Sequence, residues 1–224
     1  RDFDLRVESR RVLGVIGRTG AGKTTLTRLI PRLYDPDVGV VLLGGVDIRS
    51  VQLTAVRSRV GVVTQDIHLF TATLRDNLTI FGQSVADDGI VRVLDLLGLR
   101  GWLNALPEGL DTVISGGELS AGQVQLLACA RIFLGDPDIV ILDEASSRLD
   151  PVTERLLHEA LRALLKGRTG IIVAHRLSTL DLVDDILVIE DGRAREHGPR
   201  LELAADPTSR YSELLRISAA EALA

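Results

Sequence analysis

One segment near the amino terminus constrains the fold of this chain more than any other. Residues 17–24 read Gly-Arg-Thr-Gly-Ala-Gly-Lys-Thr, which fits the phosphate-binding loop pattern G-x-x-x-x-G-K-[ST]. The apolar run Val12–Ile16 before this segment predicts a buried strand, and Lys23–Arg32 predicts a helix. A strand, a glycine-rich turn and a helix in this order are typical of an α/β fold.

Each part of this segment suits the binding of phosphate groups. Glycines let backbone N–H groups surround an anion, and the start of a helix adds positive potential. Lys23 would reach the β- and γ-phosphates, and the Thr24 hydroxyl could ligate Mg²⁺. A chance match in an ordinary strand-to-helix turn is the alternative, and the flanking strand and helix argue against it. The predicted nucleotide-binding residues here are Gly17, Thr19, Gly20, Ala21, Gly22, Lys23, Thr24 and Thr25.

The rest of the chain alternates short Val- and Ile-rich runs with longer segments of helical period, which predicts a mostly parallel sheet covered by helices. Glu190-Asp191-Gly192 lies between two strand-like runs and predicts a hairpin turn. The further predicted strands are Val60–Val63, Ile139–Leu142, Ile171–Ala174 and Ile186–Ile189. The further predicted helices are Ile90–Leu97, Ala121–Leu134, Val152–Leu165 and Tyr211–Ala220.

Polar side chains follow several of these strands where the strands end. Asp143-Glu144 ends one, Gln65 follows another and His175 a third, and α/β sheets bind ligands at this edge. Asp143 would hold Mg²⁺ through water, while Glu144 would polarise the attacking water. An isolated Asp-Glu pair is otherwise a solvated turn, and a lone histidine is more often structural. The convergence of these residues with Lys23 favours the catalytic interpretation.

A second helix start also has the residue types of an anion site. Leu119-Ser-Ala-Gly-Gln123 opens the predicted helix Ala121–Leu134. Ser120 with Gln123 three residues later fits a capping box, which would be a purely structural role. A helix start that exposes Ser and Gly can also bind an anion. Both interpretations remain open from the sequence.

Taken together, these motifs resemble the nucleotide-binding domain of ATP-binding cassette (ABC) transporters. The resemblance covers nearly all of the chain and rests on the following segments: Gly17–Thr24, Gln65, Leu119–Gln123, Asp143-Glu144, Ser147–Asp150 and His175. It implies that Gln65 is the Q-loop residue and a further Mg²⁺ ligand, and that His175 is the switch histidine. It also implies that Ser120, Gly122, Gln123 and Asp150 contact nucleotide, and that Glu144, His175 and Gln65 are the catalytic residues.

The same resemblance implies a P-loop NTPase core with an inserted helical lobe that contains the signature motif. We expect the α/β core at about residues 1–64 and 136–198, the helical lobe at about 65–135 and a C-terminal helical segment at about 199–224. Thr64–Phe70 and Leu74–Leu78 look like the exporter segment that receives helices from a membrane domain, and Ala174–Ser178 looks like the exporter switch region. Ile67, Leu69 and Phe70 could equally belong to the core.

The function implied is Mg²⁺-dependent ATP hydrolysis that powers transmembrane transport, with ATP and Mg²⁺ as cofactors. The expected partners are a second nucleotide-binding domain, identical or different and arranged head to tail, and a transmembrane domain fused N-terminally. The expected location is the cytoplasmic face of the cell membrane. The formal charge of −5 argues against nucleic-acid binding. The alternatives are a soluble ABC ATPase without a membrane domain, and a degenerate regulatory half of a heterodimeric transporter.

Several residues depart from the family pattern or stand outside it. By the resemblance, Ser120–Gln123 is the signature motif and Ser147–Asp150 is the D-loop. Ala121 replaces the first glycine of the signature motif, Arg148 replaces a small residue of the D-loop, and residues 115–118 look shortened. The adenine-stacking aromatic of the family would lie upstream of Arg1, and we expect Phe3 to pack in a strand instead. The chain lacks methionine and starts at Arg1, so we expect it to be a piece of a longer polypeptide. The single cysteine, Cys129, is expected to be inert in a helix interior.

Overall fold

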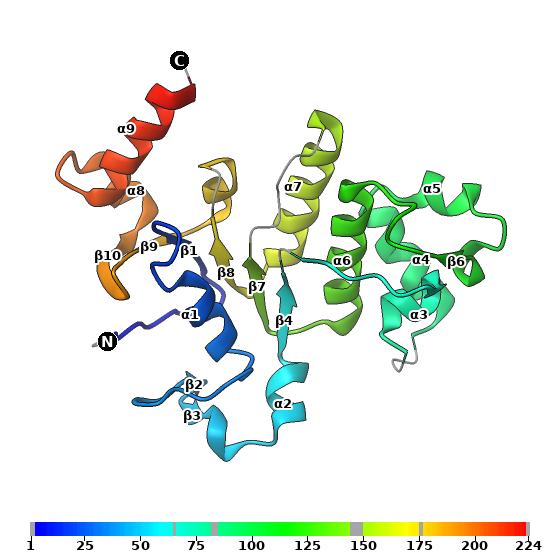
Figure 1. Ribbon diagram of the computed structural model, residues 1–224, viewed down its shortest axis with the longest axis horizontal. Helices are drawn as coiled ribbons and strands as arrows, with labels where there is room; N and C mark the ends of the chain where they lie inside the picture. Colours follow the sequence, from blue (N-terminus) through cyan, green and yellow to red (C-terminus); the bar gives the residue numbers. More distant parts are fainter. Residues whose placement is uncertain (1–2, 65, 82–84, 144–149, 175–176, 223–224) are drawn as a thin grey trace. The chain divides into compact units, whose positions relative to one another are not determined.

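The computed structural model describes residues 3–64, 66–81, 85–143, 150–174 and 177–222 (Figure 1). The chain forms two compact units, which we describe separately. The first unit consists of Arg1–Val62, Asp138–Glu144 and Gly167–Ala224, and the second of Val63–Pro137 and Ala145–Lys166. We expected the core to continue through residues 136–198, so the assignment of residues 145–166 to the second unit differs from our predicted boundary.

A six-stranded sheet in the order β10-β9-β1-β8-β7-β4 dominates the first unit (Figure 1). The central strand β1 pairs in parallel with both β8 and β9, and β7 pairs in parallel with β8. All five residues of β1 are buried, because helices and loops cover both faces of a parallel sheet. The strands are β1 Val12–Ile16, β4 Val60–Val63, β7 Ile139–Asp143, β8 Thr169–Val173, β9 Asp185–Glu190 and β10 Arg193–Pro199.

The predicted hairpin turn joins β9 to β10, which pairs antiparallel with it. Asp191 and Gly192 form the two-residue turn with φ of 51° and 73°. Two successive left-handed residues define the turn type whose twist matches that of the flanking strands, and Asp-Gly is a preferred sequence for it.

The remaining elements of the first unit are short, apart from the last helix. They are α1 Lys23–Leu29, β2 Leu42–Leu43, β3 Val46–Asp47, η1 Ile48–Ser50, α2 Leu53–Ser58, η3 Leu177–Leu182, α8 Arg200–Ala205 and α9 Arg210–Ala222. Arg210 at the start of α9 makes an ion pair with Glu190 of β9, and the Glu196 carboxylate of β10 accepts hydrogen bonds from the Arg210 and Tyr211 N–H groups. These contacts hold the C-terminal helix to the hairpin.

The second unit is mostly helical. Its elements are β5 Ala72–Thr73, α3 Leu74–Thr79, α4 Asp87–Leu96, α5 Arg100–Ala105, η2 Gly109–Asp111, β6 Val113–Ile114, α6 Ala121–Gly135 and α7 Pro151–Leu165. Helix α6 packs against α3, α4 and α7. The buried residues of α7 recur at helical spacing on one face, and they are Leu157, Ala160, Leu161, Leu164 and Leu165.

The sequence predictions of secondary structure hold for the main elements and fail at Phe3. Residues 3–8 form no strand, so our placement of Phe3 in a strand is wrong, although its partly buried ring does pack against the core of the first unit. Among the described helices, none is long and apolar enough to cross a lipid bilayer.

Candidate functional site

The glycine-rich segment forms an open loop between β1 and α1. Gly22 precedes α1 with φ 107° and makes no side-chain cap, and the helical hydrogen bonding starts with Leu26 N–H to Gly22 O at 3.1 Å. The N–H groups of Thr24 and Thr25 come before this first bond, so they have no acceptor within the helix. Gly20 has φ 82° and open space where a Cβ would stand. The loop and the start of α1 therefore leave backbone donors without acceptors from the helix.

Lys23 lies inside this loop rather than in solvent. Its side chain is only 5% exposed, and Nζ donates to Gly17 O at 2.7 Å and to Arg18 O at 3.1 Å. Carbonyl oxygens replace part of the water shell that the ammonium loses on burial. The charge is thereby held inside the loop that the sequence pattern predicts to bind phosphate.

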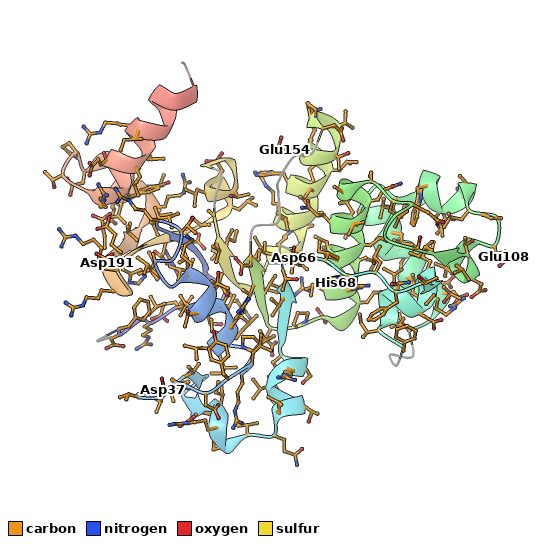
Figure 2. All side chains as sticks on the ribbon, in the orientation of Figure 1. Asp37, Asp66, His68, Glu108, Glu154 and Asp191 are labelled. Atoms are coloured by element: carbon orange, nitrogen blue, oxygen red, sulfur yellow. The ribbon has the colours of Figure 1, made fainter. Side chains whose placement is uncertain are left out.

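The β9–β10 hairpin lies directly beneath the phosphate loop. A Cβ on Gly17, which has φ 152°, would stand 2.2 Å from the Ile189 carbonyl oxygen. The Gly192 N–H donates to Ala21 O at 3.1 Å. Asp191, labelled in Figure 2, belongs to the same turn. Gly17 is thus required for close backbone approach, and Gly192 supports the loop, a role that the sequence did not reveal.

The carboxyl end of β7 reaches the same region of the first unit. The Thr27 hydroxyl of α1 lies 3.4 Å from Asp143 Oδ2 and 3.0 Å from Thr24 O. Thr24 and Asp143 offer a hydroxyl and a carboxylate, which are hard oxygen donors of the kind Mg²⁺ prefers. Among the described residues, no group of three or more His, Cys, Asp or Glu side chains could hold a metal ion. One carboxylate with a hydroxyl fits Mg²⁺, because that ion usually takes its other ligands from water and phosphate.

In the second unit, the start of α6 is closed by its own side chains. Ser120 Oγ accepts from Gln123 N–H at 3.2 Å, and Gln123 Oε1 accepts from Ser120 N–H at 2.9 Å. The capping box is therefore present. It leaves the Ser120 hydroxyl proton and the Gln123 amide N–H groups as donors, so it is compatible with anion binding.

Gly122 is required by packing against α7. A Cβ on Gly122 would stand 2.0 Å from Thr153 Cγ2, a distance that no real contact has. Asp150 caps the start of α7 by accepting the N–H groups of Val152 and Thr153, both at 3.1 Å. The hydrogen bond from the Thr153 side chain and those from the backbone hold the pKa of Asp150 below its ordinary value. The two helix starts are thus in direct contact.

The remaining predicted residues divide into two groups. Thr19 and Gly20 of the loop and Thr24 and Thr25 at the start of α1 are exposed, whereas Ala21 of the loop is buried. Gln65, Glu144 and His175, with Ser147 and Arg148, lie outside the described residues, so their catalytic and metal-binding roles remain predictions. Cys129 is buried in α6, and burial raises its thiol pKa to about 12, which fits an inert packing role.

A mostly parallel sheet with a phosphate loop after its central strand and an acidic strand end beside the loop defines a P-loop nucleotide-binding domain. Residues 1–147 match the family model described as "ABC transporter". The chain therefore belongs to the ABC transporter family, and its α/β structure is that of an ABC ATPase.

Comparison with individual proteins agrees with this assignment. The chain is 39% identical, over 97% of its length, to ABC transporter B family member 21 of Arabidopsis thaliana, of which it covers 17%. It is 42% identical, over 92% of its length, to the fatty acid ABC transporter ATP-binding/permease protein of Mycobacterium bovis, of which it covers 33%. A bacterial Atm1-family ABC exporter with ATP bound superposes with a TM-score of 0.88 at 34% identity, over 97% of this chain and 38% of that one.

Proposed function

We propose that this chain is the ATP-hydrolysing domain of an exporter in which a transmembrane domain belongs to the same polypeptide. Two observations support the proposal. The phosphate loop encloses Lys23, and Thr27 of the following helix lies 3.4 Å from Asp143 Oδ2. The related transporters are fused ATP-binding and permease proteins that extend well beyond the aligned region. The transporter names of these relatives favour transport over a soluble ATPase. The phosphate loop is the observation that most directly supports ATP binding.

The proposed hydrolysis reaction uses residues of both the loop and the strand ends. The loop N–H groups and Lys23 hold the β- and γ-phosphates, and Glu144 accepts a proton from the attacking water. Thr24, Asp143 and Gln65 would hold Mg²⁺, which neutralises phosphate charge when it is bound. His175 would donate to the γ-phosphate.

The signature and D-loop residues would act on a nucleotide held by another subunit. We propose that two nucleotide-binding domains close head to tail, with Ser120, Gly122 and Gln123 of each facing the phosphate loop of the other. Asp150 would lie at the same interface. The Ser120 hydroxyl can donate to a phosphate while it still caps α6, and this double use supports the proposal.

The membrane domain would dock on an exposed apolar surface of the second unit, at the cytoplasmic face of the membrane. We call this surface, formed by Phe70, Ile80 and Phe81, the aromatic surface. Its side chains are 48%, 52% and 56% exposed, and the two rings contact edge to face with centroids 5.2 Å apart. Ile67 and Leu69 are partly buried, so the exposed ring of Phe70 favours docking over a role in the core.

The substitution Glu144→Gln tests the proposal in the full-length polypeptide that carries this domain. We expect ATP affinity to stay within about twofold and ATP turnover to fall by at least ~10²-fold, the scale of a lost general base. Glu159→Gln is the matched control, because Glu159 is exposed on α7 and is not among the predicted site residues. Near-normal turnover of Glu144→Gln would refute the proposed catalytic role.

A further inference from the structure

The segment that carries Phe70 has little regular structure of its own. Residues 66–71 form no helix or strand, so their backbone N–H and C=O groups need partners from elsewhere. Figure 2 labels Asp66 and His68 on this segment. Thr64 Oγ1 donates to Asp66 O at 2.9 Å, and two polar side chains from helices, Asn77 of α3 and Arg131 of α6, bond to the backbone further along the segment. We call the two residues together the polar clamp.

Asn77 bonds to the backbone of Phe70 and of strand β5, which follows the segment. It is fully buried, its Oδ1 accepts the Phe70 N–H at 2.8 Å and its Nδ2 donates to Phe70 O at 2.9 Å. Nδ2 also lies 3.1 Å from Thr73 O and 3.3 Å from Ala72 O. The backbone of Phe70 is therefore fixed while its ring stays exposed. A surface fixed in this way needs little ordering when it binds a partner.

Arg131 joins this arrangement to α6. Its guanidinium donates to Asn77 O at 2.8 Å, to His68 O at 3.0 Å and to Asn77 Oδ1 at 3.3 Å. Arg131 is partly buried, and its bonds offset the desolvation of its charge. Helix α6 runs without a break from Ala121 to Gly135. Arg131 thus connects the aromatic surface to the same rigid helix that begins next to Ser120.

We propose that Asn77 and Arg131 are positioning residues that fasten the aromatic surface to helix α6, so that a displacement of this surface by the membrane domain also moves the helix start at Ser120. The inference rests on the docking surface of the proposed function. It adds a mechanical role for two residues to which the proposed function assigns no contact with nucleotide or membrane domain.

The test is a double-mutant cycle on ATP turnover in the full-length polypeptide in lipid nanodiscs. Arg131→Lys keeps the positive charge but removes the guanidinium, which donates to the carbonyl oxygens of Asn77 and His68 at the same time. We expect ATP turnover to fall about fivefold. Phe70→Ala should also lower turnover, by removing the docking ring. Both substitutions interrupt the same connection between the aromatic surface and α6. The ATP turnover of the double variant should therefore be no more than about twofold below that of the slower single variant. ATP affinity should stay within about twofold in all of them.

Two further variants make the cycle decisive. Asn77→Asp keeps the acceptor for the Phe70 N–H and loses the Nδ2 donors, so it tests the second member of the polar clamp. It replaces Arg131→Lys in the cycle if that variant does not fold. Arg32→Lys is the matched control, because Arg32 also donates to two backbone carbonyls, those of Ile48 and Val51, in the first unit. In the double variant of Arg32→Lys and Phe70→Ala, the fold-loss of ATP turnover should equal the product of the two single losses.

The outcomes separate this inference from the function on which it rests. If the effects of Arg131→Lys and Phe70→Ala multiply, or if neither clamp variant lowers turnover, the polar clamp does not connect the surface to α6 and docking still stands. If Phe70→Ala alone leaves turnover unchanged, the proposed docking surface is wrong and the inference fails with it. If the double variant of Arg131→Lys and Phe70→Ala loses less ATP turnover than the product of the two single losses, the inference is supported.

Discussion

Helices α1 and α6 both begin at residues predicted to bind nucleotide phosphates, yet their first turns differ. Helix α1 follows Gly22, whose left-handed backbone carries no side chain to cap the helix. Helix α6 follows Ser120, which forms a complete capping box with Gln123. A capping box satisfies two donors at the helix start, whereas an uncapped start leaves its donors for solvent or a ligand.

This difference indicates how each start relates to a phosphate. At α1, a phosphate would supply the acceptors that no side chain provides, so binding and helix capping are the same event. At α6, the helix is stable without a ligand, and only the hydroxyl proton of Ser120 and the amide of Gln123 remain to be used. We infer that the first site binds ATP on its own and that the second only adds contacts.

The largest expected effect is at the uncapped start. Lys23→Ala removes the ammonium that the loop carbonyls hold, so ATP affinity measured by calorimetry should fall about 100-fold, the scale of two lost charge-assisted hydrogen bonds. Lys166→Ala is the control, because Lys166 is the other lysine of the chain and is exposed. If the ATP affinity of Lys23→Ala is unchanged, the inference that the α1 site binds ATP on its own, while the α6 site only adds contacts, is wrong.

A smaller effect is expected at the capped start of α6, where the packing of Gly122 against α7 determines the stability. Gly122→Ala places a methyl group 2.0 Å from Thr153 Cγ2, so urea unfolding should show a loss of about 1–3 kcal/mol. Thr153→Ser removes that methyl group and keeps the hydroxyl, so the double variant should recover most of the lost stability. If it recovers stability but ATP turnover stays low, Gly122 also has a role in nucleotide contact. If stability does not recover, the packing account is wrong.

The smallest effect concerns Asp150, the cap of α7. Its pKa is lowered in the folded state by the Thr153 side chain and by backbone N–H groups, so its contribution to stability is present above the unfolded value of about 3.9. That contribution is lost as the pH falls through the lowered folded value. Asp150→Asn also caps helices well, so stability at pH 7 should change little while the acid-induced loss becomes smaller. Parallel stability curves of the two proteins from pH 7 to pH 3 would contradict this assignment.

Local sequence patterns were enough to predict the main elements and the phosphate loop. Val12–Ile16 and Val60–Val63 are strands with the predicted ends, and Ala121–Leu134 is extended by one residue in α6. These segments carry a clear apolar period and clear start or stop residues. Pairs such as β2–β3 and β5–β6 were missed, because strands of two residues are too short to show a period.

The contacts that depend on pairing between distant elements could not be predicted. Gly122 fits the signature pattern, but its contact with Thr153 exists only because α6 packs against α7. Asn77 and Arg131 are 54 positions apart, and a buried asparagine has the same local sequence signal as an exposed one. The sequence also gave no sign that Gly192 supports the phosphate loop.

The support of the phosphate loop by the β9–β10 hairpin has a consequence for the order of folding. Strand β1 pairs with β8 and β9, and Ala21 bonds to Gly192, so residues at the start of this domain pair with partners about 170 positions later in the chain. During synthesis the loop sequence therefore leaves the ribosome long before the strands that fix its backbone. ATP can act as a folding ligand only at the end of this process, when it stabilises a nearly complete first unit by mass action.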